Sequence, residues 1–86
     1  MKENKEEKYL ENIMEILNTL EYAEDYLTIE DIMEKTKIDN KTQIQNILNK
    51  LKEKKIIGSS RGKNGGYFLT ETIKDMNKEY IKRILD

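Results

Sequence analysis

The chain has 86 residues, of which 36% are hydrophobic and 38% are charged, and its net charge is −1. A chain of this length forms a single domain with a thin hydrophobic core. It contains no cysteine and no histidine, which excludes thiolate and imidazole metal sites, disulfides, iron–sulfur ligation and thiol or histidine catalysis.

The first part of the chain predicts a charged leader followed by an amphipathic helix. Residues 1–7 are expected to be a disordered leader, and the helix is expected over about residues 5–20. Its polar residues, Asn12 among them, are expected on an exposed face. At 100° per residue the apolar side chains fill a face about 160° wide. These side chains belong to Tyr9, Leu10, Ile13, Met14, Ile16, Leu17 and Leu20.

Two short helices joined by a tight turn follow, which is the helix-turn-helix pattern. Thr28 is a candidate N-cap that forms a capping box with Asp31, and its helix is expected to end near Thr36. Asn40 then caps a third helix, expected over residues 40–54. In this helix apolar residues recur at i, i+3, i+4 and i+7. They are Ile44, Ile47, Leu48 and Leu51.

The segment after the third helix predicts a β-hairpin with a cationic tip. Two short strands are expected over residues 56–60 and 67–70, with Arg61 in the loop between them. The Asn64-Gly65 pair supplies the positive φ angles that a tight hairpin needs. A hairpin directly behind a helix-turn-helix forms the wing of a winged helix.

A last helix is expected to begin near Thr72, with Asp75 as its capping partner, and to run to about Leu85. Its apolar arc is about 180° wide. Because a thin head could not cover this arc and the face of the first helix, we expect a homodimer joined through both helices. The alternative is that both helices pack on the same head. The predicted fold is mainly α with a small β-hairpin, a single winged helix-turn-helix domain over residues 1–86.

The charge is unevenly distributed along the chain. Between Lys41 and Lys63 seven residues are positive and one is negative, so that this segment carries +6, whereas the rest of the chain carries −7. A DNA backbone responds to the local field more than to the total charge. The basic segment coincides with the third helix and the wing, which indicates DNA binding. The alternative is an ordinary solvated, lysine-rich helix end.

The side chains opposite the apolar face of the third helix are mostly short and neutral, and they can both donate and accept hydrogen bonds. Asparagine and glutamine can read adenine in the major groove, whereas the flanking lysines suit phosphates. The alternative is an ordinary polar surface on an asparagine-rich chain. The candidate DNA-binding residues on this helix are Lys41, Thr42, Gln43, Gln45, Asn46, Asn49 and Lys50. Those on the wing, over residues 59–66, are Ser59, Ser60, Arg61, Lys63 and Asn64.

One pattern continues from the third helix through the wing. It consists of Ile47-Leu48-Asn49-Lys50-Leu51, Ile56-Ile57, Arg61-Gly62, Gly65-Gly66-Tyr67 and Leu69. This pattern resembles the Rrf-type family of bacterial winged-helix repressors, which includes the iron–sulfur cluster regulator and the nitric-oxide-sensitive repressor. The resemblance implies a DNA-binding head in which Arg61 is the wing arginine and the third helix is the reader.

The chain also departs from that family. Its sensing members carry three cysteines beyond the wing, and this chain has none. The family usually continues into a long dimerisation helix, whereas only residues 72–86 follow the wing here. The resemblance therefore does not extend to sensing iron–sulfur clusters or nitric oxide, and we expect no cofactor and no small-molecule effector.

The sequence thus predicts a cytosolic regulator of transcription, either a repressor or an activator, that binds double-stranded DNA specifically and catalyses no reaction. The third helix would enter a major groove, and the wing would lie on adjacent backbone or minor groove. One alternative is a phage- or plasmid-encoded accessory protein for replication or conjugative transfer. Another is a winged-helix module that binds proteins. No nucleophile with a base and no phosphate loop before a helix supports an enzyme.

Overall fold

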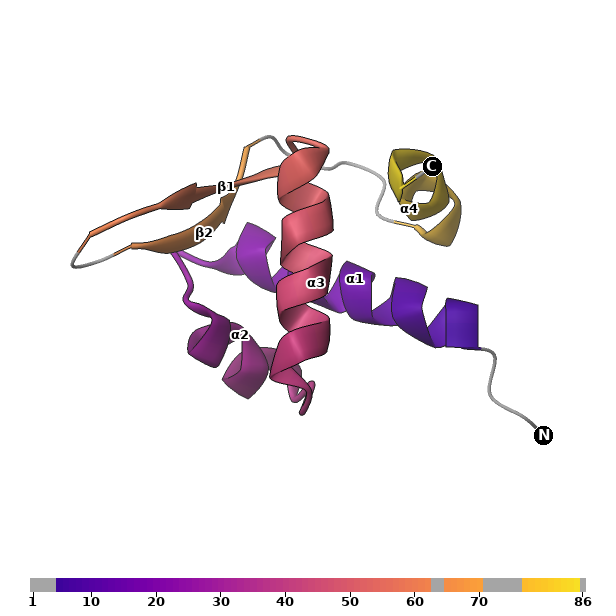
Figure 1. Ribbon diagram of the computed structural model, residues 1–86, viewed down its shortest axis with the longest axis horizontal. Helices are drawn as coiled ribbons and strands as arrows, with labels where there is room; N and C mark the ends of the chain where they lie inside the picture. The colour runs from indigo at the N-terminus through magenta and orange to yellow at the C-terminus, as the bar shows by residue number, and fades with distance from the viewer. Residues whose placement is uncertain (1–4, 63–64, 71–76, 86) are drawn as a thin grey trace.

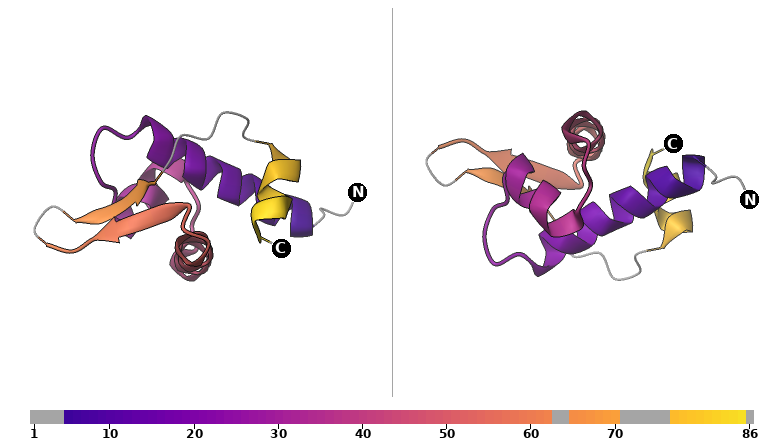
Figure 2. Two further views of the ribbon diagram at one scale, coloured as in Figure 1. Left: turned by 90° about the horizontal axis from the view of Figure 1, so that it is seen from above. Right: turned by 90° about the horizontal axis from the view of Figure 1, so that it is seen from below.

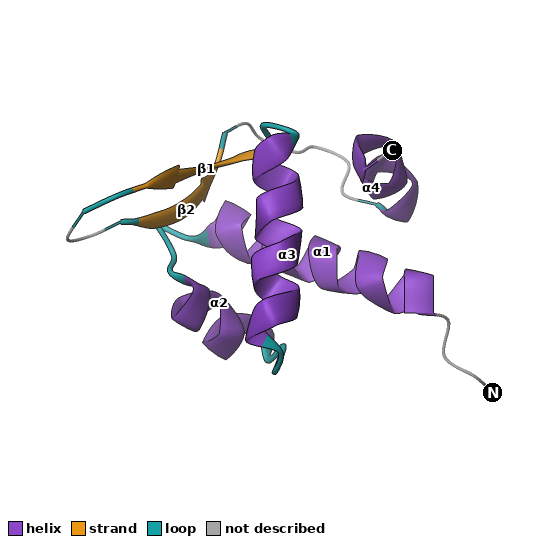
Figure 3. Cartoon of the chain, in the orientation of Figure 1, coloured by secondary structure: helices purple, strands orange, loops and turns teal. Residues whose placement is uncertain are grey.

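The computed structural model describes residues 5–62, 65–70 and 77–85. Within this part of the chain, helices and a two-stranded hairpin follow one another in the predicted order (Figures 1 and 3). The predicted fold class, a winged helix-turn-helix, is confirmed. The elements are α1 (Lys5–Tyr22), α2 (Ile29–Thr36), α3 (Lys41–Glu53), β1 (Ile57–Ser60), β2 (Gly66–Leu69) and α4 (Lys78–Leu85).

Helix α1 forms the base on which α2, β2 and α4 pack. The inward residues Leu10, Ile13, Ile16, Leu17 and Leu20 are all buried. Asn12, which we expected on the exposed face, is buried as well, with 6% of its surface exposed. Asn12 continues the i, i+4 row formed by Ile16 and Leu20, so it lies at the edge of the apolar face. The buried part of α1 is therefore wider than the sequence predicted.

Helix α2 begins at the predicted capping box. The Asp31 backbone N–H donates to Thr28 Oγ1 and the Thr28 backbone N–H donates to Asp31 Oδ2, both over 3.1 Å. The second of these bonds lowers the pKa of Asp31 from its ordinary value of 3.8, because it stabilises the carboxylate. The helix ends at Lys37, whose φ of 60° is left-handed and whose N–H donates to the Met33 carbonyl.

Helix α3 begins and ends with a defined cap. Asn40 Oδ1 accepts a hydrogen bond from the Gln43 backbone N–H over 3.0 Å, as predicted for an N-cap. At the other end Lys55 is left-handed, with φ 64°, and the Ile56 N–H donates back to the Leu51 carbonyl. These contacts form a Schellman motif, in which buried Ile56 follows the left-handed residue. Four α3 side chains are completely buried, as the helical period predicted: Ile44, Ile47, Leu48 and Leu51.

Strands β1 and β2 are antiparallel, with Ile57 opposite Leu69 and Ser60 opposite Gly66. The connection is longer than the tight Asn64-Gly65 turn that we predicted. The Gly65 N–H donates to the Gly62 carbonyl, and the positive φ angles among the described wing residues occur at Gly62 and Gly66. Asn64 itself lies outside the described residues.

The segment between α1 and α2 pairs with the outer edge of β2. The Tyr67 N–H donates to the Leu27 carbonyl over 2.7 Å, and the Leu27 N–H donates to the Tyr67 carbonyl over 3.1 Å. Gly66 lies directly against this bridge. The wing is therefore joined to the helical core along β2 as well as through α3.

Helix α4 packs on α1 within the same chain (Figures 1 and 2). Its Ile81 is completely buried in the core that contains Ile13. This packing agrees with the alternative in which both helices finish one head. We expected that one head could not cover the apolar face of α1. This expectation is wrong, because the inward residues of α1 are buried within the chain. The side chains of Ile84 and Leu85 lie outside the described ones.

The start of α4 is also corrected by the structure. The helix begins at Lys78 rather than near Thr72, because Asn77 is not helical and caps it. Asn77 Oδ1 accepts from the Tyr80 N–H over 2.8 Å, and the Asn77 carbonyl accepts from the Ile81 N–H over 3.1 Å. Thr72 and the proposed partner Asp75 lie outside the described residues. In the described part of the chain, no helix combines the length and apolarity that crossing a membrane requires.

Candidate nucleic-acid interface

Helix α3 projects from the side of the molecule opposite α1, and the wing extends beside it (Figure 2). Because Ile44, Ile47, Leu48 and Leu51 fill the inner face of α3, its other face points away from the core. The candidate readers Thr42, Asn46 and Asn49 are exposed there, whereas Gln43 and Gln45 are half-buried. The structure therefore places Thr42, Asn46 and Asn49 on the outward surface of α3, with Gln43 and Gln45 at its margins.

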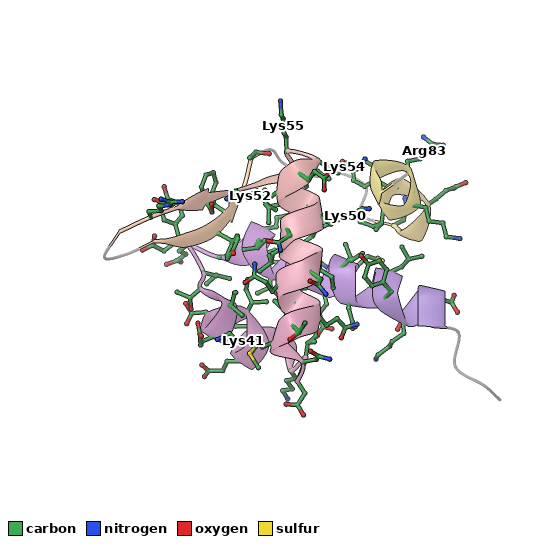
Figure 4. The ribbon with its side chains drawn as sticks, in the orientation of Figure 1. Lys41, Lys50, Lys52, Lys54, Lys55 and Arg83 are labelled. Carbon is green, nitrogen blue, oxygen red and sulfur yellow. The ribbon has the colours of Figure 1, made fainter. Side chains whose placement is uncertain are left out.

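Basic side chains lie at both ends of this surface. Lys41 is near the N-terminal end of α3, and Lys50, Lys52, Lys54 and Lys55 gather toward its C-terminal end (Figure 4). All of these lysines are exposed. Figure 4 also shows Arg83 on α4, to the right of the C-terminal half of α3. The sequence had not identified Arg83 as a candidate, because only the fold places α4 beside this end of the molecule.

Lys41 makes an ion pair that the sequence did not predict. Its Nζ lies 3.0 Å from Glu30 Oε1 on α2, and both side chains are largely exposed. The hydrogen bond from Lys41 lowers the pKa of Glu30, because it stabilises the carboxylate. Phosphate would have to compete with Glu30 for this lysine. The pair depends on the turn between α2 and α3, which brings residues eleven apart in sequence together.

A hydrogen-bond network joins the outward face of α3 to the wing. Gln45 Nε2 donates to Asn49 Oδ1 over 2.9 Å, one helical turn further along α3. The same nitrogen donates to the Tyr67 hydroxyl over 3.4 Å. Gln45 is therefore held between its own helix and the wing. The sequence did not predict this contact between the wing and a candidate reader.

The two faces of the wing have different surroundings. Ile57, Tyr67 and Leu69 share the inward face, and Ser59, paired with Tyr67, lies on it as well. Ser60 belongs to the opposite face by strand alternation. The structure therefore places the two candidate serines on different sides of the wing.

The opposite face of the wing packs against the connection between α1 and α2. The Phe68 ring lies 5.1 Å from the Tyr26 ring, between centroids, at an angle of 35°. Gly58 lies under Phe68, because a Cβ there would come within 2.6 Å of the ring. Three acidic residues, Glu21, Glu24 and Asp25, line the open hollow beside this pair. Its negative charge makes this side unsuitable for a phosphate backbone.

The loop of the wing is described only in part. Arg61, the wing arginine that the family resemblance implied, is exposed directly after the end of β1. Ser59 is also exposed, and Ser60 is half-buried. Lys63 and Asn64 lie outside the described residues.

A family model described as "Rrf2: Iron-dependent Transcriptional regulator" matches residues 3–86. The chain belongs to the Rrf2 family. The resemblance predicted from the third helix and the wing is thus confirmed, and it extends over nearly the whole chain. Rrf2 proteins are transcriptional regulators, not enzymes, and they bind DNA.

Two solved structures share the Rrf2 fold of this chain. IscR of T. potens is 22% identical, with a TM-score of 0.74, over 100% of this chain and 61% of the IscR chain. CymR (YrzC), the global cysteine regulator of B. subtilis, is 16% identical, with a TM-score of 0.57, over 99% of this chain and 89% of CymR. This chain thus spans less than two thirds of the IscR length. A comparison with curated proteins found no match.

The iron named in the Rrf2 family description does not fit the residues of this chain. The chain has no cysteine and no histidine, so the thiolate ligands of an iron–sulfur cluster are missing. In the ranges that the structure describes, no group of three or more acidic side chains could hold a metal ion either. We therefore assign no iron-dependent step to this protein.

Proposed function

We propose that this chain is a transcriptional regulator that binds double-stranded DNA at a specific sequence. In this proposal the recognition helix (residues 40–54) enters the major groove, and the wing (residues 59–66) lies on the adjacent backbone or in the minor groove. The outward face of α3 carries the proposal. It presents neutral side chains that can donate and accept hydrogen bonds, between exposed lysines and beside the wing.

The dimensions of α3 suit a major groove. At a rise of about 1.5 Å per residue, Lys41 and Lys50 lie about 14 Å apart along the helix axis. The major groove is about 12 Å wide. Lysines at the two ends of the helix can therefore approach phosphates on both sides of the groove. Thr42 and Asn46, between them, then face the base edges.

The surface charge supports DNA over a protein partner. Protein interfaces are depleted in lysine at their centre, whereas lysines here lie at both ends of the surface that carries the candidate readers. Each lysine that neutralises a phosphate releases counterions and strengthens binding at low salt. The acidic side chains near the Tyr26–Phe68 pair lie on the other face of the wing, so they do not oppose this approach.

A selection of bound sequences from a random duplex library tests the proposal. We expect enrichment of a defined site, because the readers on α3 are rigidly placed by the buried face of the helix. Asn46→Ala should then cost about 1–3 kcal/mol on the selected site and much less on random DNA. Asn18→Ala, at an exposed position of α1, is the matched control and should bind as the wild type does. Failure to enrich any sequence would contradict sequence-specific binding.

We also propose that the protein acts as a homodimer. The apolar face of α1 is buried in the core of its own chain. We therefore propose that the two subunits contact each other through α4. A two-fold dimer would present two recognition helices to half-sites one helical turn apart. Sedimentation velocity tests this proposal: Ile84→Asp combined with Leu85→Asp should convert a dimer into a folded monomer with weaker DNA binding. A wild-type monomer on a non-palindromic site would contradict it.

A further inference from the structure

Gln45 is the one candidate reader for which the structure gives hydrogen bonds to both α3 and the wing among the described residues. A side-chain amide nitrogen has two N–H groups. Gln45 Nε2 directs one to Asn49 Oδ1, 2.9 Å away, and the other to the Tyr67 hydroxyl, 3.4 Å away. Its donors are thus both engaged within the protein. Within the described ranges the structure gives no hydrogen bond to the carbonyl oxygen Oε1 of Gln45, which is therefore left for a partner.

The same hydrogen bond leaves Asn49 with the opposite role, that of a hydrogen-bond donor. Its Oδ1 accepts from Gln45, so its amide nitrogen remains as the donor. The two residues are four apart on α3 and therefore neighbours on one face of the helix. Together they present a hydrogen-bond acceptor at Gln45 followed by a donor at Asn49.

The geometry points to Tyr67 as a positioning residue that sets the base preference of the recognition helix. This inference rests on the proposed function and adds to it the chemical groups that Gln45 and Asn49 read. Gln45 Oε1 would accept a hydrogen bond from an exocyclic amine, which in the major groove is adenine N6 or cytosine N4. Asn49 would donate to an acceptor on a neighbouring base pair, such as guanine O6 or thymine O4.

A glutamine without these two hydrogen bonds would recognise a base pair differently. A free glutamine reads adenine with two hydrogen bonds, one to N6 through its oxygen and one to N7 through its nitrogen. Because the nitrogen of Gln45 is already engaged, the second bond is blocked. The wild-type protein should therefore accept adenine or cytosine at this position with similar affinity.

The surroundings of Tyr67 suit it to hold Gln45 in place. Its backbone is bonded in both directions to Leu27, and its ring packs against the core. The hydroxyl thus has a fixed position that does not depend on DNA. Tyr67→Phe removes this oxygen and leaves the ring, the Leu27 bridge and the strand pairing in place. One N–H of Gln45 is then released toward the groove.

Base selection from a random duplex library tests the inference on the wild type and three variants. Tyr67→Phe should shift the Gln45 position toward adenine over cytosine by about fivefold or more, because a bidentate contact becomes possible. Asn49→Ala should release the other N–H and give a shift in the same direction, with the preference at the neighbouring base pair lost. Tyr26→Phe, which removes a hydroxyl on the other side of the wing, should select as the wild type does.

The outcomes separate this inference from the function on which it rests. A wild type that enriches no site overturns both. A wild type with a defined site whose base preferences Tyr67→Phe leaves unchanged overturns the role of Tyr67 alone. Thermal unfolding of Tyr67→Phe provides a further check. A merely structural tyrosine would lower stability and weaken binding to all duplexes equally, without changing the ratio of adenine to cytosine.

Discussion

Gly66 and the Leu27 carbonyl are so close that a Cβ added to the glycine would stand 2.6 Å from the oxygen. Gly66 also has a φ of 156°, which L side chains rarely adopt. The contact lies beside the two hydrogen bonds between Leu27 and Tyr67. It explains why the wing needs a glycine at this position: the chain that enters α2 pairs with β2 there.

Gly66→Ala should therefore destabilise the protein. Overpacking of this kind costs about 1–3 kcal/mol, measured as the free energy of unfolding in urea. Gly62→Ala is the matched control, because φ at Gly62 is 126° but a Cβ would find open space. The Gly62→Ala variant also places a side chain at a positive φ, but it creates no clash, so it should lose less stability than Gly66→Ala. Equal losses in the two variants would show that the approach of Leu27 contributes nothing.

Lys55→Gly should stabilise the fold while weakening DNA binding. The left-handed φ of 64° at Lys55 is unfavourable for a side chain, so glycine there should add about 0.5–1 kcal/mol to the free energy of unfolding. The variant also loses a positive charge from the proposed interface, which lowers affinity at low salt. Lys55→Ala should show the loss of affinity without the gain in stability. A Lys55→Gly variant that unfolds more easily than the wild type contradicts this account of the cap.

The capping box should make stability depend on pH. The pKa of Asp31 is lower in the folded protein than its ordinary value of 3.8, because of its hydrogen bonds with Thr28. Because the pKa of Asp31 is lower in the folded than in the unfolded protein, the ionised carboxylate stabilises the fold. This stabilisation is fully present above pH 3.8 and is lost as the pH falls through the pKa of the folded protein. Asp31→Asn should reduce the loss of unfolding free energy on acidification. Parallel pH profiles for the variant and the wild type would exclude this contribution.

The wing arginine should contribute affinity that is independent of sequence. If Arg61 contacts one phosphate, Arg61→Ala should weaken binding to all duplexes and reduce the salt slope by about one unit. Insertion into the minor groove would add a loss of A·T preference at flanking positions. Lys8→Ala is the charge-matched control, because Lys8 is exposed in the first turns of α1. The N-terminal end of α1 lies far from the wing (Figure 1). Unchanged affinity of Arg61→Ala at low salt would remove the wing from the interface.

The local elements could be predicted because their determinants lie within a few residues. Thr28 and Asp31 form their capping box over three residues, and the buried face of α3 follows from one helical period. The start of α4 was missed because Thr72 and Asn77 both carry capping chemistry. Sequence spacing alone could not decide between them.

The parts of the site that escaped prediction depend on contacts between distant segments. The Lys41–Glu30 pair needs the turn between α2 and α3, and the Gln45–Tyr67 bond needs the hairpin folded against α3. The burial of Asn12 likewise depends on how elements pack around α1. Periodicity identifies which residues share a face, but not what covers that face.

A map of the DNA-bound surface tests whether α3 and the wing together form the DNA interface. Backbone amide chemical shifts of the protein can be followed by nuclear magnetic resonance during titration with the selected duplex. We expect the shifts to concentrate on Thr42, Asn46, Asn49 and Arg61, with little change around Tyr26. Shifts concentrated around Tyr26 and along α1, with α3 unchanged, would contradict it.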